Sequence, residues 1–151
     1  MKGMTVGALA LVLLLTGATQ VRADAVYHTE RLTLDPVGGA SGSGMVVNIH
    51  PNGRQVYAHE IYALKGTLPD TDYVVRLWVH PFDTDCSEAG VNFARTPVRT
   101  NPAGNGHGEL FISPDQVPDA LRGNQMHGVR WDVTLNGVPQ YETRCTIVTL
   151  D

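Results

Sequence analysis

Hydrophobic and polar residues alternate with a period of two along most of the chain after residue 25. Between residues 72 and 80, for example, Val75, Leu77 and Val79 share one face of an extended segment, and the other face is expected to meet solvent. Apolar residues at helical spacing do not persist long enough to form a main helix. The pattern predicts an all-β protein. We expect strands near residues 26–34, 44–50, 54–64, 72–80, 92–99, 107–113, 127–135 and 141–150.

Turn signals separate these segments. Asn52-Gly53 and Asn136-Gly137 lie between alternating runs, and both dipeptides favour the positive φ angles of a tight hairpin turn. Ser113 and Pro114 predict one short helical turn between residues 113 and 121. About eight short strands joined in this way favour a Greek-key antiparallel β-sandwich or a flattened barrel.

The first 23 residues have the pattern of a secretory signal peptide. Lys2 precedes an apolar run that extends from Met4 to about Ala18, and small residues at Val21 and Ala23 suit signal peptidase. Cleavage after Ala18 or after Ala25 is an alternative. The run is shorter than the roughly 20 apolar residues that span a bilayer. We therefore expect an exported protein, secreted or periplasmic, with a mature domain at 24–151 and no membrane span after cleavage.

The composition narrows the class of protein. A length of 151 residues suits one domain, and 42% hydrophobic with 17% charged residues is typical of a folded globular chain. The net charge of -4 argues against nucleic acid as a partner. In an exported chain two cysteines are expected to pair, and Cys86 and Cys145 are the two present. A free or catalytic cysteine pair is the alternative.

Two segments in the middle of the chain resemble a known family. Residues 78–83 (WVHPFD) and 86–93 (CSEAGVNF) resemble the central segment of Cu/Zn superoxide dismutases, in which His-x-His precedes Gly-Cys-x-Ala-Gly-x-His-Phe. The resemblance continues in order over most of residues 26–150. It implies a superoxide dismutase-like β-sandwich and a disulfide from Cys86 to Cys145 in the last strand. Residues 68–73 also resemble the tyrosine-corner segment of fibronectin type III domains, so an immunoglobulin-like or fibronectin type III-like sandwich is the alternative.

The metal ligands of that family are largely replaced in this sequence. The resemblance places Trp78 at the first His of the His-x-His pair, Asn92 at the bridging His and Thr134 near the last copper ligand. His80 alone is retained, and Glu142 stands where the family has the Arg that attracts superoxide. One imidazole cannot fix the geometry of copper. We therefore expect no catalytic residues, no dismutase activity and no bound cofactor.

The leading hypothesis is an exported binding or structural domain on this scaffold. Tyr57 and Trp78 are the candidate contact residues, with the alternative that Trp78 fills core space left by the lost copper site. The partner is expected to be an unidentified protein, glycan or surface component. Because the family often dimerises, a homodimer is a further arrangement that the resemblance implies.

The alternative hypothesis is a metalloprotein. Six histidines in an acidic exported domain suggest a rearranged copper or zinc site, since neutral imidazole is a common ligand for both metals. The candidate ligands are His80, His107 and His127. Such a protein would act as a metal carrier or as a superoxide dismutase with a changed site.

Overall fold

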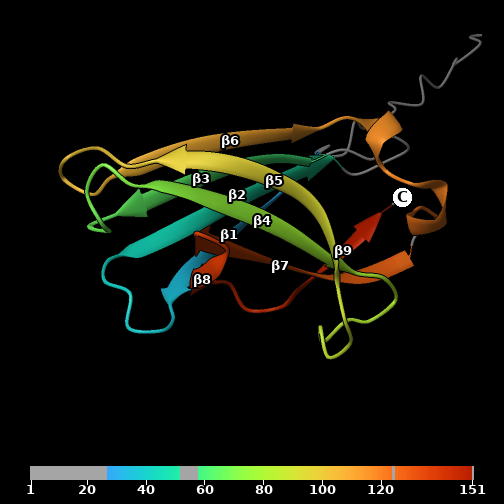
Figure 1. The fold of residues 1–151 in the computed structure, drawn as a ribbon. Coiled ribbons are helices and arrows are strands. Elements are labelled where there is room, and N and C mark those ends of the chain that lie inside the picture. The colour runs from blue at the N-terminus through green and yellow to red at the C-terminus, as the bar shows by residue number, and fades with distance from the viewer. Residues whose placement is uncertain (1–26, 52–57, 124, 151) are drawn as a thin grey trace, which may run out of the picture.

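The computed structural model describes residues 27–51, 58–123 and 125–150, and the fold in this part of the chain is all-β, as the sequence predicted (Figure 1). Short helical turns, η1 (Pro114–Gln116) and η2 (Asp119–Leu121), follow Ser113 and confirm the helical turn predicted there. The predicted signal peptide, Tyr57 and the dipeptide Asn52-Gly53 lie outside the described residues. The strands are β1 (Tyr27–Pro36), β2 (Ser43–Pro51), β3 (Ala58–Lys65), β4 (Asp72–His80), β5 (Val91–Arg99), β6 (Gly106–Ile112), β7 (Gln125–Leu135), β8 (Val138–Glu142) and β9 (Thr146–Leu150).

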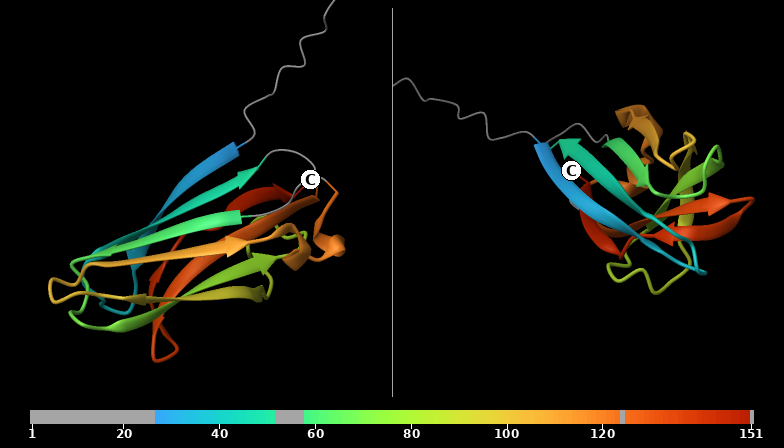
Figure 2. Two further views of the ribbon diagram at one scale, coloured as in Figure 1. Left: turned by 90° about the horizontal axis from the view of Figure 1, so that it is seen from above. Right: turned by 90° about the vertical axis from the view of Figure 1, so that its left-hand side faces the viewer.

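The strands form two layers that join into a nearly closed antiparallel barrel or sandwich (Figure 2). One layer has the order β1-β2-β3-β6 and the other has the order β5-β4-β7-β8, with β9 paired to β7. The layers join where Asp35 of β1 pairs with Glu142 of β8, and Thr100 forms a single bridge to Gly106 at the opposite corner. Because β7 returns to lie beside β4 after β5 and β6, these four strands have the Greek-key order.

Hairpin geometry agrees with the turn residues at one of the two predicted positions. Leu135 pairs with Val138, and Asn136 and Gly137 have φ angles of 51° and 82°, as a type I′ turn requires. The β2–β3 ladder differs from the prediction, because it pairs Ile49 with His59. A two-residue turn at 52–53 would instead pair residue 49 with residue 56, and residues 52–57 themselves lie outside the described part of the chain.

The predicted strand at 141–150 is two strands. β8 pairs with the last residues of β7 and β9 pairs with its first residues, so both lie along the same edge of β7. Between them the backbone N–H of Thr143 donates to the carbonyl of Trp131, and the Thr143 hydroxyl accepts a bond from the Trp131 N–H. This irregularity, which ends at Cys145, interrupts the ladder.

The core lies between the two layers and is built from the inward positions of the alternating strands. At the closing corner, Gly108 of β6 allows close approach, since a Cβ there would lie 2.6 Å from Val98 of β5. Burial of this apolar surface is the main stabilising contribution in such a barrel. The buried hydrophobic residues are Leu34, Val46, Tyr62, Leu64, Tyr73, Val75, Leu77, Val79, Val98, Ile112, Val117, Val129, Trp131, Val133, Tyr141 and Val148.

Candidate functional site

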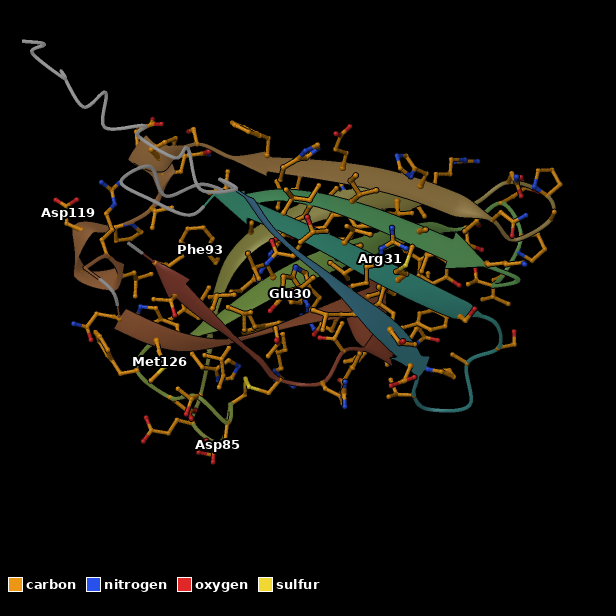
Figure 3. All side chains as sticks on the ribbon, turned by 180° about the vertical axis from the view of Figure 1, so that it is seen from behind. Glu30, Arg31, Asp85, Phe93, Asp119 and Met126 are labelled. Atoms are coloured by element: carbon orange, nitrogen blue, oxygen red, sulfur yellow. A yellow bond between two sulfur atoms is a disulfide. The ribbon has the colours of Figure 1, made fainter. Side chains whose placement is uncertain are left out.

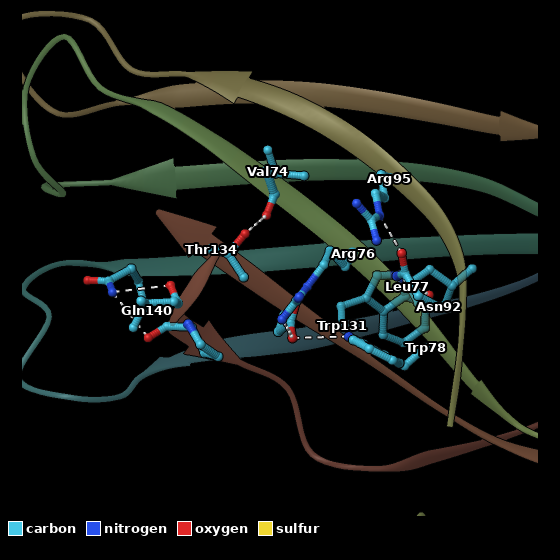
Figure 4. Close-up of polar contacts among 12 residues, drawn as sticks. Val74, Arg76, Leu77, Trp78, Asn92, Arg95, Trp131, Thr134 and Gln140 are labelled. Carbon is cyan, nitrogen blue, oxygen red and sulfur yellow. Dashed lines mark hydrogen bonds and ion pairs between the residues drawn. The ribbon is translucent and has the colours of Figure 1, made fainter. Parts of the chain in front are cut away.

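A polar network covers the outer face of β4 and β7. The guanidinium of Arg76 donates to both carboxylate oxygens of Asp132, at 2.7 and 2.5 Å, and the indole N–H of Trp78 donates to the same carboxylate at 3.0 Å (Figure 4). The Arg76 guanidinium lies 5.0 Å from the centre of the Trp78 ring, and that of Arg130 lies 6.0 Å from it. Asp132 is buried although it lies on the outer face of the sheet.

Trp78 is the member of this network that stands at a position the family resemblance assigned to a metal ligand, and Asn92 and Thr134, at two other such positions, lie on strands of the same layer. Trp78 is half-buried in the network and is not part of the core between the layers. Asn92 donates to the carbonyl of Leu77 at 3.3 Å, and its own carbonyl oxygen accepts a bond from Arg95. The Thr134 hydroxyl donates to the carbonyl of Val74 at 3.2 Å. Each of these side chains is therefore engaged within the sheet.

The three candidate histidine ligands are not brought together. His80 is buried, its Nδ1 lies 2.9 Å from the carbonyl oxygen of Glu88, and its Nε2 has no hydrogen-bond partner among the described residues. His127 is buried with Nδ1 accepting from the Phe82 N–H and Nε2 near the carbonyl oxygen of Leu121. His107 is exposed on β6 of the other layer. Within the described ranges, no group of three or more His, Cys, Asp or Glu side chains is arranged to hold a metal ion.

The disulfide between Cys86 and Cys145 is present, as the sequence predicted. It connects the loop after β4 to the residue that precedes β9. Gly128 of β7 lies against it, because a Cβ at this position would be 2.9 Å from the Cys86 sulfur and 3.1 Å from the Cys145 sulfur. The bond thus fixes the loop beyond β4 against β7.

A cavity enters the barrel between the layers at the end where β9 stops and the η turns lie. Its volume is about 60 Å³. Phe93 lines this cavity, and in Figure 3 it lies at the same end of the barrel as Asp119 of η2. The lining is almost entirely apolar: Ala58, Leu77, Val79, Phe93, Ile112, Val117, Leu121, Val129, Trp131, Val148 and Leu150, with Asn48 and Glu60 as the exceptions.

The two polar lining residues are cross-strand neighbours. Asn48 of β2 pairs with Glu60 of β3, so both side chains point into the barrel. Glu60 is 1% exposed, and its Oε2 accepts hydrogen bonds from the Tyr62 hydroxyl and, at 2.7 Å, from the indole N–H of Trp131 in the opposite layer. Asn48 is 3% exposed, and its Oδ1 has no hydrogen-bond partner among the described residues.

Burial dominates the acidity of Glu60. Removal from water penalises the carboxylate and raises the pKa of Glu60 to about 7, although the bonds from Tyr62 and Trp131 act in the opposite direction. The same burial raises the pKa of the Tyr62 phenol. The cavity therefore holds a carboxyl group that changes charge near neutral pH and has no ion pair with any described residue.

Sequence reasoning missed Glu60 and Asn48, although a signal for both was present. Glu60 is in phase with Tyr62 and Leu64 on β3, and Asn48 is in phase with Val46 on β2. A charged or amide residue at a position that alternation assigns to the core is rare unless it has a partner or a role. The inward position of these two polar residues in the alternating pattern could therefore have identified Asn48 and Glu60 as candidate site residues.

No family model, curated protein or solved structure matches the chain. None of the helical turns in the described residues is long and apolar enough to cross a membrane.

Proposed function

We propose that this chain is an exported, non-catalytic binding domain that holds a small apolar ligand inside its barrel. The observation that carries the proposal is the cavity, whose apolar walls enclose an unpartnered amide oxygen and a buried carboxyl group. Ligand pockets are typically apolar with a small number of polar groups that orient the ligand. A buried acceptor without a partner costs free energy that a ligand donor would recover.

The size of the cavity limits the ligand to a slender group. A cavity of about 60 Å³ has room for a small group and not for a bulky one. The rest of a longer molecule would extend past Leu121 and Leu150 toward the surface. A linear alkyl chain meets these limits better than a fused ring system.

The proposal includes a superoxide dismutase-like scaffold without dismutase activity. The Cys86–Cys145 disulfide supports the likeness, since the same pairing is expected from the family. The engagement of Trp78, Asn92 and Thr134 in sheet contacts supports the loss of the metal site. After loading with copper and zinc, the purified protein should retain no stoichiometric metal and give no superoxide consumption above the buffer. Retained metal that is lost in His80→Ala would contradict this part and favour the carrier hypothesis.

Titration with hexan-1-ol tests the cavity directly. Binding should raise the melting temperature by mass action and change the fluorescence of Trp131, which lines the cavity. The variant Trp78→Phe removes the second indole signal without touching the cavity. Absence of both changes at saturating alcohol would contradict the proposed function.

Two variants reduce the cavity volume, and one matched control leaves it unchanged. Ala58→Leu places extra carbons in the cavity from β3, and Val117→Leu does so from the end of η1, so each should weaken hexan-1-ol binding by about tenfold or more. Ala63→Leu adds the same group on the outward side of β3 and should bind as the wild type does. Circular dichroism establishes that each variant is folded. Unchanged affinity in both cavity variants would place the ligand elsewhere.

A further inference from the structure

We propose that the cavity selects a primary amine, with the ammonium group of the ligand held between Glu60 and Asn48 and its alkyl chain along the apolar walls. This inference rests on the proposed function, because it names the ligand class for the same cavity. It follows from the number and kind of polar atoms that the described residues leave without partners.

Two acceptor oxygens without hydrogen-bond donors among the described residues face the ligand position. Both bonds to the Glu60 carboxyl group end at Oε2, so Oε1 has no hydrogen-bond donor among the described residues. Oδ1 of Asn48, the cross-strand neighbour, is also without a donor there. A hydroxyl group carries one proton and satisfies one of these oxygens, whereas an ammonium group carries three and satisfies both.

The charge of the Glu60 carboxylate also favours an ammonium group over a hydroxyl group. The Glu60 carboxylate lies in an apolar cavity without a counter-ion in the described part of the chain, and Asp132 on the outer face shows the contrasting case of a carboxylate paired with Arg76. A ligand cation would supply the missing partner, and charge-assisted hydrogen bonds are about twice as strong as neutral ones. A carboxylate ligand would meet like charge and two acceptors, so the cavity should reject it.

Among the groups around the cavity, Glu60 is the one expected to set the pH dependence of amine binding. The titratable side chains in its surroundings are Tyr62 on the same strand and Glu30 of β1, which lies one strand beyond Asn48 in the same cross-strand row. The facing residues of the other packed strands do not titrate: Asn48, Leu77, Leu110, Trp131 and Val148. An alkylamine has a pKa near that of lysine, about 10.4, and stays charged at both pH values used below.

Isothermal titration calorimetry of the full chain with hexylamine, hexan-1-ol and hexanoate tests the inference. At pH 8 hexylamine should bind about tenfold or more tightly than hexan-1-ol, and hexanoate more weakly than either. At pH 5.5 the advantage of the amine should fall, and amine binding should release protons because it favours the ionised carboxyl group. Buffers of different ionisation enthalpy measure that release.

Glu60→Gln is the decisive variant, because it keeps the shape and the acceptor oxygen but not the charge. It should weaken hexylamine binding by about tenfold and abolish the proton release, with hexan-1-ol affinity little changed. Glu30→Gln, in the same row but outside the cavity lining, should behave as the wild type does. If hexan-1-ol binds and hexylamine binds no more tightly, or if Glu60→Gln weakens both ligands equally, the inference fails and the proposed function stands. If neither ligand binds, both fail.

Discussion

Two buried carboxyl groups, Asp132 on the outer face of β7 and Glu60 on the inner face of β3, hold their charge in different ways. Each accepts a hydrogen bond from an indole N–H, from Trp78 at 3.0 Å and from Trp131 at 2.7 Å respectively. Asp132 also receives both donors of the Arg76 fork, whereas Glu60 receives neutral donors alone among the described residues. Comparing Glu60 with Asp132 therefore compares a carboxyl group that is buried without a counter-ion with one that is buried beside a counter-ion.

The comparison shows which of the two carboxyl groups is available to a ligand. At Asp132 the charge is neutralised within the sheet, and nothing remains for a ligand to supply. At Glu60 burial without a cation brings the pKa into the neutral range and leaves an acceptor facing a cavity. The outer face, where the family resemblance placed a metal site, is therefore the structural side, and the barrel interior is the candidate binding side.

The largest effect should come from Asp132→Ala. Removal of the carboxylate leaves Arg76 without its partner and Trp78 without its acceptor, and breaking a buried ion pair costs about 4 kcal/mol. Urea unfolding at pH 7 measures this loss. The exposed pair of Arg99 with Asp72 is the matched control, and Asp72→Ala should cost about 0.5 kcal/mol or less. Equal losses in the two variants would contradict the assignment of a buried, structural pair.

The second largest effect should be a dependence of the free energy of unfolding on pH, caused by the titration of Glu60. Its carboxyl group has a higher pKa when folded, about 7, than when unfolded, 4.5, so between these values the folded state binds more protons. The free energy of unfolding therefore falls as pH rises from about 4.5 through about 7, by roughly 3 kcal/mol in total. Glu60→Gln should remove this fall, so that it matches the wild type near pH 4 and exceeds it at pH 8. A wild-type minus variant difference that does not change with pH would refute the proposed titration.

A smaller loss is expected for Trp131→Phe. The change removes an indole donor to Glu60, and a hydrogen bond to a charged group is worth about 2 kcal/mol. The loss should be greater at pH 8 than at pH 5, because the bond favours the ionised form, and the pKa of Glu60 should rise further. Chemical unfolding at the two pH values measures both, and a loss of equal size at each pH would count against the proposal.

The smallest effect is expected for Trp78→Phe, the matched change on the outer face. Asp132 keeps both bonds from Arg76, so loss of the indole N–H should cost about 1 kcal/mol. The cost should be the same at pH 5 and pH 8. A pH dependence as steep as that of Trp131→Phe would remove the distinction between the two carboxyl groups.

The sequence was most informative where alternation and turn chemistry agree. The strand at 72–80 has the predicted bounds, because its apolar face is continuous from Tyr73 to Val79 and its ends meet loops. Asn136-Gly137 specified its hairpin because both residues tolerate positive φ angles. The division of the last strand was not predictable, since it depends on hydrogen bonds between Thr143, in the link from β8 to β9, and Trp131 of β7.

The candidate site was harder to predict because its properties are tertiary. Alternation places Glu60 and Asn48 on inward faces, yet it does not show that their two strands pair in register or that Trp131 approaches from the opposite layer. Likewise, Trp78 has the pattern of an exposed contact residue, and its cover by Arg76 and Arg130 follows from the pairing of β4 with β7. Sequence indicates the face of each side chain, and packing decides its partners.

The Cys86–Cys145 bond leads to an expectation about the order of folding. Its cysteines are 59 positions apart, and in the folded chain their sulfurs lie against Gly128 of β7, the strand that pairs with both β4 and β9. Contacts between distant segments form late, because closing a long loop carries an entropic cost before those contacts stabilise it. In an oxidising solution the thiols should therefore stay accessible to alkylation until the barrel is assembled, which makes their oxidation a chemical record that the native topology was reached.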